Sequence, residues 1–318
     1  MKHHGRARVL GAGLAGASVA RALLDRGWDL QIVDPNGLAA GASSDNAGMV
    51  RSLVLHADER RRAVETARRL ADLPTVFRPV GGVVAATRDE GQWDEAIADL
   101  RSLGWPVDHR RSEDAASVLR GSAARHSVVT PLDGVCDAPL LVRWLLRDVH
   151  VQPEPQGDVD LTVVATGAWA VLEGVGLVAT RRHLIRTQPH PLAQGPWVWI
   201  EGAGVYLRPE GGRFLTSACD EVEGDPTPPR GTPDAAEVLR AVAEVARWFP
   251  AVGQVEVADA RWGLRTFCAD RRARVGPDPL RPDLWWCVGL GGSGVSTALA
   301  IGEELAAQIT GVPAKGAR

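Results

Sequence analysis

A glycine-rich turn stands between two predicted strands near the N-terminus. The stretch "VLGAGLAG" places Gly11, Gly13 and Gly16 in GxGxxG spacing after an apolar run, residues 7–10. Residues 14–26 carry apolar side chains at helical spacing, and residues 29–34 (DLQIVD) are typical of a second strand. The order strand, glycine turn, helix and strand predicts a βαβ unit that opens a parallel sheet.

Each residue of this turn has a physical reason to be there. Gly11 permits the tight turn, Gly13 lets the backbone approach a pyrophosphate, and Gly16 lets helix and strand pack closely. The unpaired N–H groups of the following helix would face the phosphates. Asp34 ends the second strand, where a carboxylate can accept hydrogen bonds from ribose hydroxyls. The pattern favours a dinucleotide over a turn with no ligand, but it does not separate NAD from FAD.

A second glycine turn precedes the last predicted helix. Gly289, Gly291, Gly292 and Gly294 lie between a strand at residues 285–288 and the sequence "STALAIGEELAAQI". A bare helix N-terminus stabilises negative charge, and reduced flavin carries such charge at its pyrimidine edge. Close packing of a terminal helix on the sheet is the alternative. Together with the first turn, this motif favours a flavin.

Composition limits the remaining possibilities. The 318 residues suit one large domain or two interwoven ones, and a net charge of -3 argues mildly against nonspecific nucleic-acid binding. Lysine occurs only at Lys2 and Lys315, so no internal lysine is available for a Schiff base. The four cysteines are far apart, so we expect no zinc site or disulfide framework, and a cytoplasmic location. No apolar run approaches the ~20 residues of a membrane span.

Motifs spread along the whole chain resemble one enzyme family. In order they are "VLGAGLAGASVARALLDRGW", "GASSDNAGMV", "VVATG", "YLRPEGGRFLTSA", "GLRTFCADRRARVGPDP" and "GLGGSGVSTALAIGEELAAQI". This order is similar to the FAD-dependent D-amino-acid oxidase/glycine oxidase superfamily. Within it, residues 26–49 are most similar to the oxidase domain of the bacterial bifunctional tRNA 5-methylaminomethyl-2-thiouridine enzymes.

The resemblance implies a fold and a domain division. The fold is an α/β (α+β overall) class: a Rossmann-like FAD-binding domain with a parallel sheet and helices on both faces, plus an inserted antiparallel-sheet substrate domain. The FAD-binding domain would take residues 1–75, 130–178 and 255–318. The substrate-binding domain would take residues 76–129 and 179–254.

The resemblance also implies which residues hold FAD. The pyrophosphate and ribose would be held by the first turn, the flavin would pass the "ASSDNAG" segment, and the second glycine turn would lie at its pyrimidine edge. The predicted cofactor-binding residues are Gly11, Gly13, Leu14, Ala15, Gly16, Asp34, Ala42, Ser43, Ser44, Asn46, Ala47, Gly48, Val151, Thr166, Gly167, Gly291, Gly292, Ser293, Gly294 and Val295.

Three further residues are predicted to act on the substrate. Arg265, in "GLRT", matches the family's arginine that pairs with a substrate carboxylate, and Tyr206 matches a tyrosine that hydrogen-bonds it. Arg208 would share the strand face of Tyr206. A surface ion pair for Arg265 and a structural strand position for Tyr206 are the alternatives. Arg51 we interpret as solvated.

The chain departs from the family in three places. Only "HVQPEPQGDVD" stands where the family has a β-meander over the adenosine half of FAD, so the cofactor would be held more loosely or more exposed. His183 or Arg186 would reshape the substrate pocket in "ATRRHLIRTQ". The missing internal lysine would slow the reaction with oxygen, or point to another acceptor.

These observations predict an FAD-dependent oxidoreductase acting on CH-NH or CH-NH2 groups of a small amine or amino acid, of glycine, sarcosine or D-amino-acid type. An oxidase of a carboxymethylaminomethyl-modified tRNA wobble uridine is one alternative. A non-catalytic flavin-binding protein is another, and an NAD(P)-dependent dehydrogenase is a weaker one. We expect no membrane partner and no metal; the oligomeric state stays open.

Overall fold

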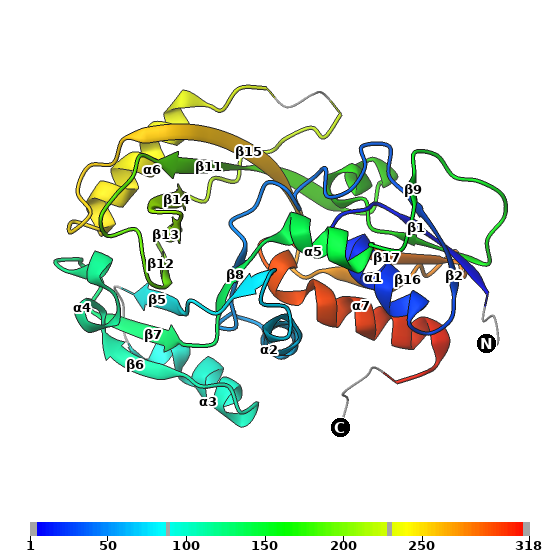
Figure 1. The fold of residues 1–318 in the computed structure, drawn as a ribbon, viewed down its shortest axis with the longest axis horizontal. Helices are drawn as coiled ribbons and strands as arrows, with labels where there is room; N and C mark the ends of the chain where they lie inside the picture. Colours follow the sequence, from blue (N-terminus) through cyan, green and yellow to red (C-terminus); the bar gives the residue numbers. More distant parts are fainter. Residues whose placement is uncertain (1–4, 87–89, 228–230, 314–318) are drawn as a thin grey trace.

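The computed structural model describes residues 5–86, 90–227 and 231–313; Lys2 and Lys315 lie outside them. Two large sheets stand side by side along the long axis of the molecule (Figure 1). The predicted α/β class is confirmed. No helix in the described ranges is long and apolar enough to cross a membrane.

The first sheet is six-stranded and mostly parallel. Its order is β16 (Arg274–Pro277), β17 (Leu284–Val288), β10 (Leu161–Val164), β1 (Arg6–Leu10), β2 (Asp29–Val33) and β9 (Val151–Gln152). All neighbours pair in parallel except β16 with β17. The predicted βαβ unit is therefore β1, α1 (Leu14–Leu24) and β2, and its two strands are neighbours inside this sheet, between β10 and β9.

The second sheet is eight-stranded and mostly antiparallel. Its order is β15 (Val257–Cys268), β11 (Leu177–Thr187), β14 (Arg213–Ser217), β13 (Val205–Glu210), β12 (Trp197–Ile200), β5 (Gly82–Ala86), β7 (His126–Thr130) and β6 (Asp108–Arg111). A small third sheet joins β3 (Met49–Val50), β8 (Gly134–Cys136) and β4 (Phe77–Arg78). The sequence of residues 197–217 has a hairpin-like pattern, and the structure forms the antiparallel strands β12, β13 and β14 there.

The longest strand pair, β11 with β15, was not predicted. These two strands run along the top of the molecule in Figure 1 and carry the second sheet toward the first. Strand β11 contains two adjacent arginines and neither strand alternates strictly between apolar and polar residues, so the period-2 signal is weak. Partners far apart in sequence, with Thr180 opposite Arg265, hold the pair together.

Helices and 3-10 turns connect the strands. The helices are α2 (Ala57–Ala71), α3 (Asp94–Ser102), α4 (Ser112–Ala115), α5 (Ala138–Leu145), α6 (Ala235–Trp248) and α7 (Gly294–Thr310), with short turns η1 (Glu90–Trp93), η2 (Ser117–Leu119) and η3 (Gly167–Glu173). The sequence of residues 105–135 has the pattern of a mixed, loop-rich segment, yet the structure has β6, α4, η2, β7 and the start of β8 there. Short elements of this length leave little periodic signal.

Helices α1 and α7 lie against each other beneath the parallel sheet (Figure 1). A Cβ on Gly302 would come within 2.6 Å of the Ser18 carbonyl carbon, so the two helices meet at backbone distance. Glu303 accepts from Arg26 at 2.9 Å and from Arg69 of α2 at 3.1 Å, and its side chain is 10% exposed. This carboxylate ties three helices together.

Candidate functional site

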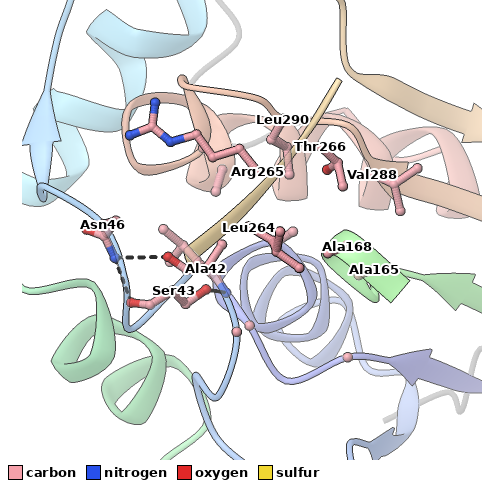
Figure 2. Close-up of a pocket in the computed structure, with 18 of the residues that line it drawn as sticks. Ala42, Ser43, Asn46, Ala165, Ala168, Leu264, Arg265, Thr266, Val288 and Leu290 are labelled. Carbon is pink, nitrogen blue, oxygen red and sulfur yellow. Dashed lines mark hydrogen bonds between the residues drawn. The ribbon is translucent and has the colours of Figure 1, made fainter. Parts of the chain in front are cut away.

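A cavity of about 370 Å³ lies where the two sheets meet. Its walls come from the first glycine turn, the loop of residues 40–51, strand β15 and the second glycine turn (Figure 2). Arg265, Thr266 and Leu264 of β15 face Ala42 and Ser43 across it. The two glycine motifs, nearly the whole chain apart in sequence, therefore border one space.

The first glycine turn has the geometry that its sequence predicts. Gly11 has a φ of +103°, and a Cβ there would overlap the carbonyl oxygen of Ala165 at the end of β10. A Cβ on Gly16 would overlap the carbonyl oxygen of Gly11, so helix and strand pack closely only because Gly16 has no side chain. Gly13 caps α1 without any side-chain hydrogen bond, which leaves backbone N–H groups for an anion.

Ser43 and Asn46 shape the loop opposite this helix end. The Leu14 N–H donates to Ser43 Oγ at 2.8 Å. The Asn46 amide donates to the Ser43 carbonyl at 2.7 Å and accepts from the Gly48 N–H at 2.7 Å (Figure 2). These bonds hold the backbone of residues 42–48 along the cavity wall, where a bound cofactor would pass.

Asp34 has a structural role that sequence reasoning missed. Its two carboxylate oxygens accept from the Ala12 N–H and from the Asn36 N–H, each at 2.9 Å. The first bond fixes the glycine turn to the end of β2. Each oxygen keeps a second lone pair, so Asp34, which also lines the cavity, can still accept from a ribose hydroxyl.

The second glycine turn presents another helix end. Ser293 caps α7 without a side-chain bond to the helix, and its hydroxyl donates instead to Glu59 at 3.2 Å. A Cβ on Gly291 would stand 2.6 Å from the Phe267 ring, so this turn too approaches its neighbours closely. The N-terminus of α7 can therefore stabilise negative charge in the cavity.

Strand register places the predicted substrate residues on one face of the second sheet. Arg265 lies opposite Thr180, and Arg182 lies opposite Gly263, so both arginines share a face. Tyr206 lies opposite Trp199 on one side and Ser217 on the other. The Tyr206 ring stacks on Trp199 with 5.5 Å between centroids.

The charges on this face are only partly compensated. The Arg265 side chain makes no hydrogen bond or ion pair with the described part of the chain. Burial lowers the pKa of Arg265 to about 10, and the charge of Arg182 contributes, yet Arg265 stays cationic at neutral pH. Burial raises the pKa of Tyr206 to about 12, so its hydroxyl stays protonated. That hydroxyl has no partner among the described residues and can donate to an anion.

Most predicted site residues line the cavity. These are Gly11, Gly13, Leu14, Ala15, Asp34, Ala42, Ser43, Asn46, Ala47, Gly48, Thr166, Gly167, Gly291, Gly292, Gly294, Val295 and Arg265. Gly16, Ser44, Val151, Ser293, Tyr206 and Arg208 are not among its lining residues. Val151 pairs with Ile32 in the sheet, and the fully buried Tyr206 lies behind Trp199.

Arg208 is held by a neighbouring acid. Its guanidinium bonds to Glu210, which Arg186 also contacts at 2.9 Å. Arg186 pairs in addition with Asp259 at 2.9 Å, so it belongs to an ion-pair network on the sheet rather than to the cavity.

His183 faces away from the cavity, contrary to the expectation that it would reshape the pocket. Its Nδ1 lies 2.7 Å from Asp220, and its Nε2 accepts from the Asp234 N–H at 3.0 Å, at the start of α6. Arg182 and His183 are adjacent on β11, so their side chains point to opposite faces. The ring is a structural link between the sheet and α6.

Two of the lining residues that sequence reasoning did not assign to the cavity are a cation and an aromatic ring that contact each other. Arg51, interpreted as solvated, lines it, and so does Trp199. The Arg51 guanidinium lies over the Trp199 ring, 4.7 Å from its centroid, and donates to the Gly292 carbonyl at 3.2 Å. A sequence signal was present, because Arg51 directly follows the "NAGMV" segment, but its partners lie far away in the chain.

The parallel sheet begins with the glycine turn of residues 11–16, and the second sheet stands over the cavity. This arrangement is that of a nucleotide-binding oxidoreductase fold. The chain belongs to the DAO family of FAD dependent oxidoreductases, whose model matches residues 7–152 and 148–308. FAD is the cofactor of this family. The residues fit it: the N-termini of α1 and α7, neither of which is capped by the side chain of its own N-cap residue, and the backbone at glycine turns, where side chains would intrude, border one space.

Comparison with individual proteins agrees with this assignment. The chain is 25% identical, over 97% of its length, to the tRNA 5-methylaminomethyl-2-thiouridine biosynthesis bifunctional protein MnmC of Azoarcus sp. (strain BH72), and covers 57% of that protein. It thus spans little more than half the length of this curated relative.

Solved structures share the fold. L-proline dehydrogenase from P. horikoshii superposes with a TM-score of 0.85 at 19% identity, covering 99% of this chain and 96% of that one. Glycine oxidase from Geobacillus kaustophilus superposes with a TM-score of 0.80 at 19% identity, covering 98% and 96%.

Proposed function

We propose that the chain oxidises the C–N bond of a small amine or amino acid that carries a carboxylate. The observation that carries the proposal is Arg265: a guanidinium that faces the cofactor cavity and has no acidic partner in the described chain. A planar guanidinium matches a carboxylate through two parallel hydrogen bonds. A half-buried cation without an acidic partner is costly, so a site built around one is suited to an anionic ligand.

The chain's residues would bind and orient the substrate. Arg265 would hold the carboxylate, and the Tyr206 hydroxyl would donate a further hydrogen bond from behind Trp199. When bound, FAD would supply the two-electron acceptor for hydride transfer from the carbon next to nitrogen, with oxygen as the final acceptor and an imine, hydrolysed by water, as the organic product. The site therefore needs orientation and a neutral amine rather than a nucleophile.

We also propose the division into two functional units, adjusted to the sheets. Residues 1–75, 130–178 and 269–318 would bind FAD, and residues 76–129 and 179–268 would bind substrate. Strand β15 belongs by its hydrogen bonds to the eight-stranded sheet, so we assign residues 257–268 to the substrate unit.

A tRNA substrate is the second candidate, favoured by the relative's name alone. Several arginines of the chain could contact tRNA phosphates, namely those of residues 58–70 and the pairs at residues 110–111 and 181–182. The structure shows three of them engaged within the chain. Arg62 pairs with Glu304 at 2.8 Å, Arg110 with Asp108 at 2.9 Å, and Arg181 lies over Trp262. Their charge is therefore less available to phosphates. A salt-dependent shift of tRNA with the purified protein would support this candidate, and its absence at low salt would remove it.

The test is the visible spectrum of FAD-loaded protein under anaerobic addition of glycine and sarcosine. Bleaching of the flavin band by either amine supports the proposal. Arg265→Met should raise the KM for flavin reduction by the amine at least tenfold, because both guanidinium bonds to the carboxylate are lost. Arg143→Met, on the exposed side of α5, should leave that KM unchanged. A flavin band that no amine bleaches would instead support a non-catalytic flavin-binding protein.

A further inference from the structure

Arg51 is a second accessible cation in the cavity. One of its Nη atoms donates to the Gly292 carbonyl, and its guanidinium lies on the Trp199 ring, but no carboxylate of the described residues is within ion-pair distance. Glu201 and Asp133 act on it only through space. An aromatic face and a carbonyl stabilise a guanidinium but leave its net charge uncompensated.

Arg51 and Arg265 are within reach of one small molecule. A Cβ placed on Gly292 would stand 3.3 Å from Arg265 Nη1 and 3.7 Å from Arg51 Nη2. The two nitrogens are therefore no further apart than the sum of those distances. Both side chains line the same cavity, so two guanidinium groups of like charge face one space. Like charges this close are unfavourable unless anions lie between or beside them.

Arg182 adds positive potential from behind. Its side chain is 5% exposed, and Nη2 lies 3.3 Å from Glu221. Glu221 is already held by Arg271 at 2.6 and 3.1 Å, so it is shared between two cations. Arg182 Nε and Nη1 have no hydrogen-bond partner among the described residues. Burial lowers the pKa of Arg51, and Arg182 lowers it further, which reflects the same excess of cations.

We propose that the substrate carries two carboxylates: a dicarboxylic amine. One carboxylate would bind Arg265 and the Tyr206 hydroxyl, and the second would bind Arg51, with Arg182 as a positioning residue that strengthens the field of both. This inference rests on the proposed function, which requires only the first carboxylate. It explains why Arg51 and Arg265 line one cavity although no carboxylate of the described residues is in ion-pair contact with either guanidinium.

The first arm of the test measures binding without turnover. FAD-loaded protein is titrated with acetate, malonate and succinate, and the perturbation of the flavin absorbance gives each Kd. We expect malonate or succinate to bind at least tenfold more tightly than acetate, because the second carboxylate meets a second guanidinium. Arg51→Met should reduce that ratio to about threefold or less, whereas Arg51→Lys, which keeps the charge, should retain most of it.

The second arm compares two amines that differ in one carboxylate. Sarcosine and iminodiacetate share the N-alkylglycine group, and iminodiacetate has a carboxylate where sarcosine has a hydrogen. Under anaerobic conditions, iminodiacetate should reduce the flavin with at least tenfold higher apparent affinity. Arg51→Met should raise its KM more than that of sarcosine, while the flavin content of the purified variant reports whether the fold is intact.

The outcomes separate the two proposals. If sarcosine and iminodiacetate reduce the flavin equally well, the oxidase proposal stands and the second carboxylate site is wrong. If no amine reduces the flavin but malonate or succinate outbinds acetate in an Arg51-dependent way, the dianion site stands and the oxidase proposal is wrong. Equal affinity for mono- and dicarboxylates, or an Arg51→Met variant that weakens both equally, would overturn the inference.

Discussion

Arg265 Nη1 lies 3.3 Å from the point where a Cβ on Gly292 would stand, so the second glycine turn and the proposed substrate anchor touch across the cavity. Gly292 has no need of a left-handed backbone, which makes the neighbouring side chains the main constraint on its size. The glycine there keeps room for the two arginines.

Gly292→Ala should therefore impair ligand binding more than stability. The added methyl would displace the ends of Arg265 and Arg51, which are flexible, so we expect a stability loss under about 1 kcal/mol. Affinity for carboxylate ligands should fall roughly five- to tenfold, as two hydrogen bonds lose their alignment. Thermal unfolding and flavin-monitored titration measure the two effects. Gly91→Ala, at an exposed position, serves as the control, and a variant that binds carboxylates normally would contradict the assignment.

Gly11→Ala should disrupt the first turn. The new methyl would overlap the Ala165 carbonyl at a φ of +103°, so two backbone strands would have to separate. We expect a loss of about 2–4 kcal/mol and weaker retention of FAD.

Gly37→Ala is the matched control for Gly11→Ala, because Gly37 has a φ of +80° with nothing within 4 Å of the added atom. It should cost about 1 kcal/mol, the strain of the φ alone. Urea denaturation of both variants gives the comparison. Equal losses would mean that the close approach to Ala165 is unimportant.

Asp133 should make stability depend on pH in the acid range. Its carboxylate is fully buried, accepts from the Ser52 N–H at 3.0 Å and the Thr130 hydroxyl at 2.7 Å, and burial raises its pKa to about 6 from an ordinary 3.8. Between those values the folded state holds a proton that the unfolded state has released. Its contribution is thus complete below pH 3.8 and is lost as pH rises through about 6.

Asp133→Asn removes this dependence. The amide oxygen can accept both bonds, so the variant should gain about 2–3 kcal/mol over the parent between pH 4 and pH 7. Thermal unfolding of both proteins across that range measures the difference. A difference that does not change with pH would show that Asp133 titrates normally.

Asp220→Asn should loosen the attachment of α6. Asp220 accepts from the His183 backbone N–H at 2.8 Å and contacts the His183 ring at 2.7 Å, so it must accept twice. An asparagine would turn an N–H toward one of these donors, at a cost of about 2–3 kcal/mol. Hydrogen exchange in residues 235–248 should speed up. Asp158→Asn, at an exposed position, should leave it unchanged.

Local patterns predicted the parts of the fold that depend on neighbours in sequence. The β1–α1–β2 unit and its glycines were correct in detail because strand, turn and helix signals agree there. The sequence of residues 235–248 is typical of a helix with the bounds that α6 has, and the structure shows in addition that the side chain of Asp234 caps it. Strands β11 and β15 were missed because their pairing joins residues about eighty positions apart.

The candidate site divides in the same way. Backbone-binding positions such as Gly13 are visible in sequence, because glycine spacing records the conformation that they need. Arg51 could not be assigned, since its environment comes from Trp199 and Gly292, which the chain brings to it only on folding. Asp34 was assigned to a ligand, while its bond to the Ala12 N–H appears only in three dimensions.

The ion pairs of Glu303 with Arg26 and Arg69 have a consequence for the cavity at the other end of the helices. Arg26, Arg69 and the contact of Gly302 with Ser18 prevent α1 and α7 from sliding past each other. Both helices begin at the cavity, at Gly13 and Ser293. The distance between their N-termini is therefore fixed by contacts outside the site. A ligand that spans both helix ends must match that distance in length.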